Sequence, residues 1–438
     1  MMKLLAIAWI VFVAAVYCPD VGRGFIKDDF TWIRAAQAAA VDPALLIRQP
    51  DAGFYRPIVT LAFAYDYAVN GWKPRGYGWT NLRLYLLCAF AVGGLAFALG
   101  LSRRVALLSA FLWSVNPHGV NMAILWLSGR TALLLTLFSL LAAIAFARRW
   151  YGAAAALIAC ALLSKEEAVV LPFILLTWAW IERRERPSWP AVAAVCVPLV
   201  CYMCLRSLTP AMTPATAPSF YRFTADPLSV MRNAGEYLDR SATLALAAVL
   251  LAMLVHRKWP TMGASRGVVA MMAVWFLGMF AITIWLPVRS SLYAVCPSIA
   301  AAIVGALLIE STRRSPVRRS LAFEPVLAVL LVASIPIYQM RDDLRVEAAR
   351  VSQRTLTEIE HDLPVLARSG ALVLHDDRDA VFLEAFGDLA AEALRTRFGR
   401  DWDARIERTA AVSPDAAPGG VIAQYWIRRG TIARTPSP

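Results

Sequence analysis

The sequence predicts an all-α polytopic membrane protein that carries a small α/β domain at its C-terminal end. Hydrophobic residues make up 59% of the 438 residues and charged residues only 17%, which is too little charge to cover a water-soluble protein of this length. Long apolar runs follow one another from residue 4 to residue 338, and short basic clusters separate them. The chain beyond residue 340 is instead rich in charge.

Eleven apolar runs approach the length of about 20 residues that crosses the hydrocarbon core. We expect transmembrane helices at residues 4–18, 82–101, 104–117, 130–147, 150–164, 168–181, 190–206, 241–255, 268–287, 293–310 and 322–338. The first run resembles a signal peptide, but Tyr17 and Cys18 make a poor cleavage site, so we expect it to stay as a helix. The run 56–70 contains Asp66, and we expect an interfacial helix there.

The basic clusters predict the orientation in the membrane. They fall between successive pairs of runs, at Arg103-Arg104, Arg148-Arg149, Arg183 to Arg186, Arg257-Lys258 and Arg313 to Arg319. Cytoplasmic loops are enriched in Lys and Arg, so the N-terminus is expected in the cytoplasm and the C-terminus outside. This pattern also accounts for the net charge of +13 without a nucleic-acid partner. We expect a multi-pass protein surrounded by lipid in a bacterial inner membrane.

Two domains are expected, a transmembrane domain at residues 1–340 and a small soluble extracytoplasmic domain at residues 341–438. Within the second, residues 371–375 and 420–426 resemble strands, and residues 380–398 follow a helical pattern. The seven cysteines lie mostly inside apolar runs, which does not indicate a disulfide framework.

Two adjacent carboxylates, Asp28 and Asp29, lie in the first long outer connection. Their mutual repulsion raises the pKa of one of them, so that it can accept a proton, and the pair could also orient a divalent cation. The alternative is a solvated loop or an N-cap for a helix that begins at Phe30. No other cofactor is indicated, because four scattered histidines are too few for a metal cluster.

Four cations lie at the ends of apolar runs on the same expected side of the membrane as the carboxylates. They are Arg56, Arg130, Lys165 and Arg289. Such donors can absorb the charge of a phosphate leaving group, and the guanidinium fork of arginine binds two phosphate oxygens at once. The alternative is that these side chains snorkel to lipid headgroups.

The order of these motifs resembles that of the GT-C glycosyltransferases, which include protein O-mannosyltransferases, ArnT-type aminoarabinose transferases and, most similar here, the TMTC-type O-mannosyltransferases. The resemblance extends over about residues 1–310. It rests on Asp28-Asp29 after the first helix, on Phe54-Tyr55-Arg56-Pro57 with Tyr77 and Asn81, on Asn116-Pro117-His118 through Ser128-Gly129-Arg130, on Ser164-Lys165-Glu166 through Pro172, and on Arg289 with Tyr293.

The resemblance implies an inverting membrane glycosyltransferase. It would move a monosaccharide from a polyprenyl-phosphate donor to an extracytoplasmic acceptor, either a protein or a glycan or lipid. Asp28 or Asp29 would be the base, with Asp28 favoured, and the four cations would bind the donor phosphate. Glu166 would orient Lys165 or face the acceptor, and Asn81, His118 and Tyr293 would support the site.

The chain departs from the family in the element that contains Pro117, because the family usually has a Glu after this proline and Asn121 stands there. It also has Gly78 and Tyr85 where the family often has a His near the Asn, and it lacks C-terminal TPR repeats. Metal dependence and the acceptor are therefore left open. Two alternatives remain, a non-catalytic assembly factor of the same fold and a transporter or flippase for lipid-linked glycans. A transporter would place polar groups on broken helices at mid-membrane.

Overall fold

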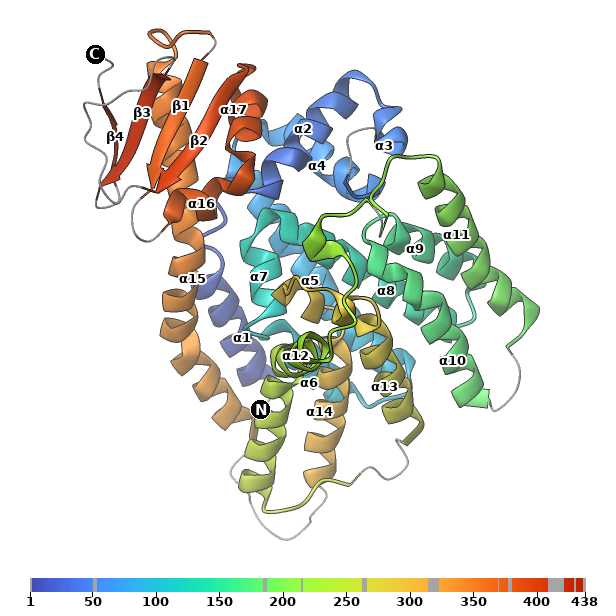
Figure 1. Ribbon diagram of the computed structural model, residues 1–438. Helices are drawn as coiled ribbons and strands as arrows, with labels where there is room; N and C mark the ends of the chain where they lie inside the picture. Colours follow the sequence, from blue (N-terminus) through green and yellow to red (C-terminus); the bar gives the residue numbers. More distant parts are fainter. Residues whose placement is uncertain are drawn as a thin grey trace.

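The computed structural model describes residues 2–49, 53–183, 187–213, 216–261, 266–313, 323–368, 370–376, 380–408, 421–428 and 431–435. Most of these residues are helical (Figure 1). The α-helices are α1 (Met2–Val16), α2 (Asp28–Val41), α3 (Leu45–Arg48), α4 (Pro57–Asn70), α5 (Pro74–Ala98), α6 (Arg103–Ser114), α7 (Gly119–Leu125), α8 (Arg130–Ala147), α9 (Tyr151–Leu162), α10 (Leu171–Arg183), α11 (Trp189–Ser207), α12 (Pro227–His256), α13 (Arg266–Phe280), α14 (Ser298–Thr312), α15 (Phe323–Asp362), α16 (Val381–Phe386) and α17 (Ala390–Phe398).

Each of the eleven predicted spans coincides with a helix, and the predicted interfacial helix is α4. The largest differences are at the end of α15, which continues to Asp362, and at the starts of α12 and α5, which begin at Pro227 and Pro74, well before the apolar runs. A proline at the first helical position suits the starts of α5 and α12, because its missing N–H has no partner there in any case.

Among the described residues, five helices are long and apolar enough to cross a membrane, and these lie at Pro74–Ala98, Leu127–Ala147, Trp189–Ser207, Pro227–His256 and Phe323–Asp343. The number of spans stays a prediction.

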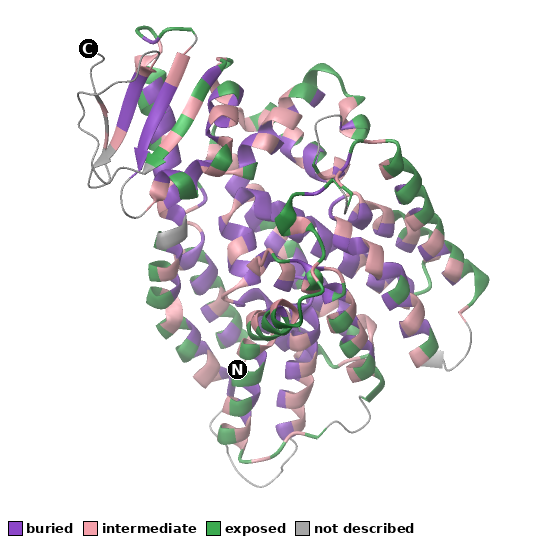
Figure 2. Ribbon diagram, viewed as in Figure 1, coloured by how far each residue is buried: buried purple, intermediate pink, exposed green. Residues whose placement is uncertain are grey.

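The exposed surface of the bundle is that of an integral membrane protein. Helix α8 lies at its centre, with 72% of its most apolar window buried, whereas α11 and α12 bury only 28% of theirs (Figure 2). On α12, Leu246, Leu250 and Leu254 recur at helical spacing and are all exposed. A stripe of exposed leucines on a helix is costly in water and is satisfied by lipid.

The two ends of the bundle differ in what they carry. At one end, Arg104 at the start of α6 pairs with Glu310 of α14 and Glu324 of α15. Helices α2, α3 and α4 and the C-terminal sheet lie at the other end (Figure 1). Arg104 belongs to the predicted cytoplasmic clusters, so the arrangement is compatible with the expected orientation, which itself stays a prediction. Of those clusters, residues 184–186 and 314–319 lie outside the described part of the chain.

The C-terminal region forms a four-stranded sheet in the order β2-β1-β3-β4, with strands β1 (Gly370–Asp376), β2 (Trp402–Arg408), β3 (Val421–Arg428) and β4 (Thr431–Thr435). Strand β1 pairs in parallel with β2 and β3, and β4 is antiparallel to β3. The two predicted strands correspond to β1 and β3, and Gly420 lies outside the described residues. The predicted helix is divided into α16 and α17, with a break at Gly387. Helix α15 runs without interruption through residue 340, so the predicted domain boundary falls inside one helix. The division into two domains stays a prediction.

Candidate active site

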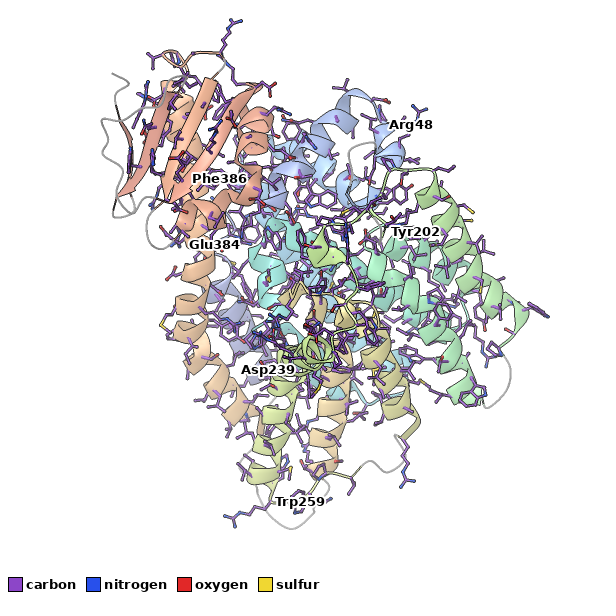
Figure 3. The ribbon with its side chains drawn as sticks, in the orientation of Figure 1. Arg48, Tyr202, Asp239, Trp259, Glu384 and Phe386 are labelled. Carbon is purple, nitrogen blue, oxygen red and sulfur yellow. The ribbon has the colours of Figure 1, made fainter. Side chains whose placement is uncertain are left out.

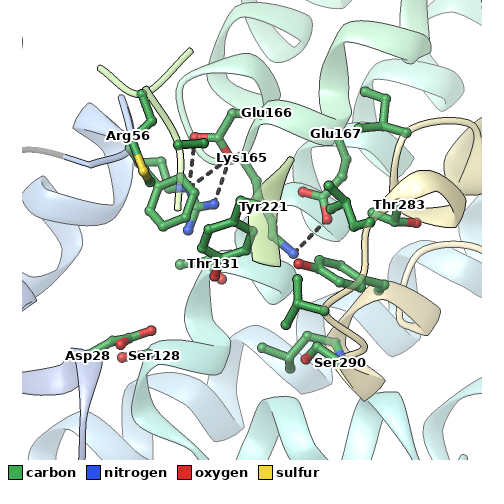
Figure 4. Close-up of a pocket in the computed structure, with 18 of the residues that line it drawn as sticks. Asp28, Arg56, Ser128, Thr131, Lys165, Glu166, Glu167, Tyr221, Thr283 and Ser290 are labelled. Atoms are coloured by element: carbon green, nitrogen blue, oxygen red, sulfur yellow. Dashed lines mark hydrogen bonds and ion pairs between the residues drawn. The ribbon is translucent and has the colours of Figure 1, made fainter. Parts of the chain in front are cut away.

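A cavity of about 530 Å³ opens among the connections at the α2–α4 end of the bundle (Figure 4). It gathers predicted site residues that are far apart in the sequence. Those lining it are Asp28, Arg56, Lys165, Glu166, Arg289 and Tyr293. Each lies in the first turn of a helix or 3-10 helix, or within two residues before one, where the chain leaves the bundle and side chains can converge.

Asp28 is the first residue of α2 and faces the cavity. Its carboxylate lies at a helix N-terminus, where the helix dipole favours an anion. Asp28 is exposed at the cavity surface, and the surrounding protein atoms still remove part of its hydration. This desolvation raises the pKa of Asp28 above its ordinary value, although the positive charges of Arg56 and Lys27 act in the opposite direction. A carboxylate of raised pKa that faces an open cavity is suited to accept a proton.

Asp29 points the other way and is fully buried. Its carboxylate accepts hydrogen bonds from the backbone N–H of Ser128 at 2.7 Å, from the Ser128 hydroxyl, and from the backbone N–H of Ile26 at 2.9 Å. Burial raises the pKa of Asp29 to about 7, against the effect of these hydrogen bonds. The two adjacent carboxylates therefore differ in their surroundings: Asp28 faces the cavity, and Asp29 fastens the first outer loop to the Ser128-Gly129-Arg130 loop.

Three cations of the cavity are each paired with a glutamate. Arg56 Nη2 lies 2.6 Å from Glu166 Oε2, Lys165 Nζ lies 2.8 Å from Glu167 Oε1, and Arg289 Nη1 lies 3.3 Å from Glu236 Oε1. The expected contact of Glu166 with Lys165 is thus replaced, since Glu166 pairs with Arg56 and the neighbouring Glu167 pairs with Lys165.

The Arg56–Glu166 pair is an ion pair rather than a neutral contact. Burial by itself raises the pKa of Glu166, but the charge and hydrogen bonds of Arg56 outweigh it, and the pKa lies below its usual value. Burial lowers the pKa of Arg56, and the Glu166 carboxylate more than compensates. A glutamate that holds the guanidinium of Arg56 in one orientation fixes the direction in which its remaining N–H donors point.

Arg130 does not line this cavity. Its side chain is fully buried, with Nη2 2.5 Å from Asp66 Oδ2 and Nε donating to Asn81 Oδ1 at 3.0 Å. Asn81 in turn donates to the carbonyls of Trp126 and Leu127 at 3.0 and 3.2 Å. Arg130 and Asn81 therefore join α4, α5 and the loop that precedes α8, and the donors proposed for a phosphate are used within the protein.

His118 and Asn121 also lie away from the cavity lining. The Nδ1 atom of His118 is 3.1 Å from a guanidinium nitrogen of Arg341, on α15. Asn121 is buried and donates to Asp342 of the same helix at 3.0 Å. Both residues therefore connect α7 and the residue before it to α15, and the position at which the family usually has Glu does not face the cavity.

Several residues of the cavity were not predicted, namely Lys27, Glu167, Arg206 and Tyr221. Arg206 ends the apolar run 190–206 and lies 3.8 Å from Glu166, so the rule that selected the other cations would also have selected it. Lys27 and Glu167 are direct neighbours of predicted residues. Tyr221 lies in a loop without any distinguishing pattern, and nothing in the sequence indicated it.

Within the described part of the chain, no group of three or more His, Cys, Asp or Glu residues is arranged to hold a metal ion. Asp28 and Asp29 do not converge, because one faces the cavity and the other is bonded to Ser128. A divalent cation at this site stays an untested expectation.

No protein-family model and no curated protein sequence matches the chain. Its fold is similar to that of ArnT from Cupriavidus metallidurans in the apo state, with a TM-score of 0.54 and 15% identity over 93% of this chain and 85% of that one. It is also similar to the Archaeoglobus fulgidus oligosaccharyltransferase in complex with Zn and sulfate, with a TM-score of 0.52 and 12% identity over 92% of this chain and 62% of that one. The chain thus spans less than two thirds of the oligosaccharyltransferase. Both neighbours are GT-C glycosyltransferases, so the predicted GT-C-like membrane fold is confirmed.

Proposed function

We propose that the protein is an inverting membrane glycosyltransferase that transfers a monosaccharide from a polyprenyl-phosphate donor to an acceptor hydroxyl. The observation that carries the proposal is a single cavity in which one carboxylate faces a cluster of cations. Its described lining includes five basic and three acidic side chains: Lys27, Arg56, Lys165, Arg206 and Arg289 with Asp28, Glu166 and Glu167. The excess of positive charge suits a phosphate, and the GT-C-like fold supports the same chemistry.

In the proposed reaction, Asp28 takes the proton of the acceptor hydroxyl as its oxygen attacks the anomeric carbon. The bond from that carbon to the phosphate oxygen breaks, and the electron pair leaves with the phosphate. Arg56, Lys165 and Arg289 would stabilise the charge that develops there, which is the usual main contribution of a preorganised site. Attack from the side opposite the leaving group inverts the anomeric centre.

A second cavity supports a reaction between two substrates. It has a volume of about 350 Å³ and shares part of its lining with the first. The shared residues are Asp28, Trp32, Phe54, Arg56 and Tyr221. Two compartments that meet at the proposed base would allow the donor to occupy the first, which has more cations, and the acceptor to approach from the second.

An apolar surface next to the first cavity suits a polyprenyl chain. Phe223 and Ile282 line both the cavity and an open groove that also includes Trp285. Phe223 and Trp285 are 57% and 45% exposed, and large apolar side chains at this exposure are compatible with a lipid ligand. A headgroup bound by the cations would leave its tail free to follow this groove.

The deciding experiment compares Asp28→Asn with the unchanged protein in proteoliposomes that contain undecaprenyl-phosphate-linked monosaccharides. Loss of a general base costs about 10²–10⁴-fold in rate, so transfer should fall by that factor while binding of undecaprenyl phosphate persists. Asp28→Glu is the matched control, since it keeps a carboxylate. Full transfer by Asp28→Asn would exclude the proposed base and favour the non-catalytic assembly factor.

The proposal also places the cavity on the extracytoplasmic side of a bacterial inner membrane. Reporter fusions after residues 104, 149, 186, 258 and 319 should then be cytoplasmic, and fusions after residues 230 and 438 should not. A cytoplasmic C-terminus would contradict both the orientation and the use of an extracytoplasmic acceptor.

Deleting residues 345–438 tests the domain division, because the membrane part should still insert if the two domains fold separately.

A further inference from the structure

The residue before the proposed base has a strained backbone. Lys27 has φ 44° and ψ −122°, a conformation that a residue with a Cβ atom adopts only rarely and glycine adopts readily. Such a conformation persists only where the surrounding structure imposes it. Lys27 directly precedes Asp28, so whatever fixes Lys27 also sets the direction of the Asp28 side chain.

Helix α16 of the C-terminal region supplies the contacts that fix Lys27. The backbone N–H of Lys27 donates to the carbonyl of Ala385 at 2.9 Å, and its ammonium lies 2.8 Å from Glu384. Phe30, in the first turn of α2, stacks on Phe386 with ring centroids 6.0 Å apart, and both rings are buried. The Lys27–Glu384 pair is exposed and contributes little. The backbone hydrogen bond and the buried rings therefore account for most of the contact.

Helix α16 is itself held by the sheet. Asp376, the last residue of β1, accepts hydrogen bonds from the backbone N–H groups of Phe382 and Leu383, both at 3.0 Å. Its side chain is almost completely buried. In Figure 3, the labelled Glu384 and Phe386 lie between the sheet and the helical bundle. A continuous series of contacts thus leads from the sheet through α16 to Lys27.

The other side of Asp28 is held by the bundle, because Asp29 is bonded to Ser128. Asp28 therefore lies between two anchored neighbours, one attached to the C-terminal region and one attached to the membrane part. From this geometry we infer that the C-terminal region is a structural part of the active site: Phe386 and Ala385 of α16 are positioning residues that hold the Asp28 carboxylate toward the cavity. The catalytic consequence of this inference rests on the proposed function, whereas the positioning does not.

Hydrogen–deuterium exchange of the full-length protein in nanodiscs tests the positioning directly. Phe386→Ala should raise the exchange rate of residues 24–32 at least tenfold, while α8 stays protected. Leu383→Ala is the matched control, because this side chain is on the same helix but is 36% exposed, and the exchange of residues 24–32 should not change. Phe386→Leu, which keeps an apolar side chain, should restore most of the protection.

Unchanged exchange of residues 24–32 in Phe386→Ala would overturn the inference, and this holds even if the substitution unfolds the C-terminal region. Loosening of residues 24–32 in Leu383→Ala to the same extent would overturn it as well, since the effect would not be specific to the buried ring.

Transfer from undecaprenyl-phosphate-linked monosaccharides gives the second readout. In Phe386→Ala, kcat should fall about tenfold or more while the Kd for undecaprenyl phosphate stays nearly the same, because Arg56, Lys165 and Arg289, the proposed phosphate ligands, are paired with glutamates outside α16. Normal kcat in Phe386→Ala, together with inactive Asp28→Asn, would overturn the inference and leave the proposed function intact. Active Asp28→Asn would overturn the proposed function, and the exchange rates would still decide the positioning.

Discussion

Two groups of charged residues lie at the same end of the bundle and differ in their access to solvent. The sealed group consists of Arg130 and Asp66, and the open group consists of Arg56, Arg289 and their glutamate partners. In the sealed group, Arg130 is fully buried, and its guanidinium donates only to protein groups such as Asp66 and Asn81. In the open group, Arg56 and Arg289 pair with glutamates, yet their side chains remain 10% and 28% exposed at the wall of a cavity. The difference indicates that the first group stabilises the fold and the second can bind a ligand.

Removing a partner from the sealed group should have the largest effect. Arg130→Ala leaves the Asp66 carboxylate buried without its counter-charge, which typically costs about 3–5 kcal/mol. We expect a large loss of folded protein, measured as the unfolding midpoint in detergent. Arg289→Ala is the control from the open group and should unfold at nearly the normal temperature. A stable Arg130→Ala would show that this arginine is not structural and would reopen its role in donor binding.

The free energy of unfolding should depend on pH through Asp29, a second buried carboxylate at this end of the bundle. Its pKa is about 7 in the folded protein and near the ordinary value of 3.8 in the unfolded chain. Between these values the folded state keeps a proton that the unfolded state releases, so stability falls as the pH rises from about 4 to 7. The slope is at most about 1.4 kcal/mol per pH unit, and it vanishes below and above this window.

Equilibrium unfolding in urea at several pH values measures this dependence. Asp29→Asn should flatten it, because the amide does not titrate, whereas Asp28→Asn should change it less. An equally steep curve in Asp29→Asn would assign the dependence to another group.

Within the open group, the smallest effect is expected for Arg56→Lys. Lysine keeps the positive charge beside Glu166 but has no planar fork to hold Glu166 and a phosphate together. Binding of undecaprenyl phosphate should weaken by about tenfold, or about 1.4 kcal/mol, with unchanged stability. Titration of the purified protein with undecaprenyl phosphate checks this, and Lys3→Arg, outside the cavity, is the control. Unchanged affinity would show that charge alone suffices at this position.

Features that depend on local sequence were mostly predicted correctly, whereas several that depend on distant contacts were not. The eleven apolar runs all became helices, because the length and composition that suit a bilayer are local properties of the chain. Asp28, Arg56 and Lys165 line one cavity, as predicted from the order of the motifs and from their expected position on one side of the membrane. Arg130 was placed with them because it also stands at a helix start, and its burial depends on Asp66, which is 64 residues earlier. The only sign available was that Asp66 interrupts an apolar run.

The different surroundings of Asp28 and Asp29 could not be predicted from the sequence either. Adjacent carboxylates at the start of a helix point in different directions, but which of them meets Ser128 is decided by the packing of a loop that is about a hundred residues away. Strand β2 was also missed, although Trp402, Ala404 and Ile406 alternate with charged residues in the pattern of a half-buried strand.

Helix α15 is a single long helix that contains Pro336, where one backbone hydrogen bond of the helix is missing. Its 40 residues extend for about 60 Å, roughly twice the thickness of the hydrocarbon core, and they connect the lipid-embedded part directly to the sheet. A long helix anchored in this way tilts, or bends at Pro336, when the bilayer becomes thinner, and we expect it to move the sheet with it. The distance between the sheet and the mouth of the cavity would then follow the acyl-chain length of the surrounding lipids. Exchange of residues 24–32 in bilayers of short and long lipids would measure this coupling, and identical rates in both would show that α15 does not transmit the change in bilayer thickness.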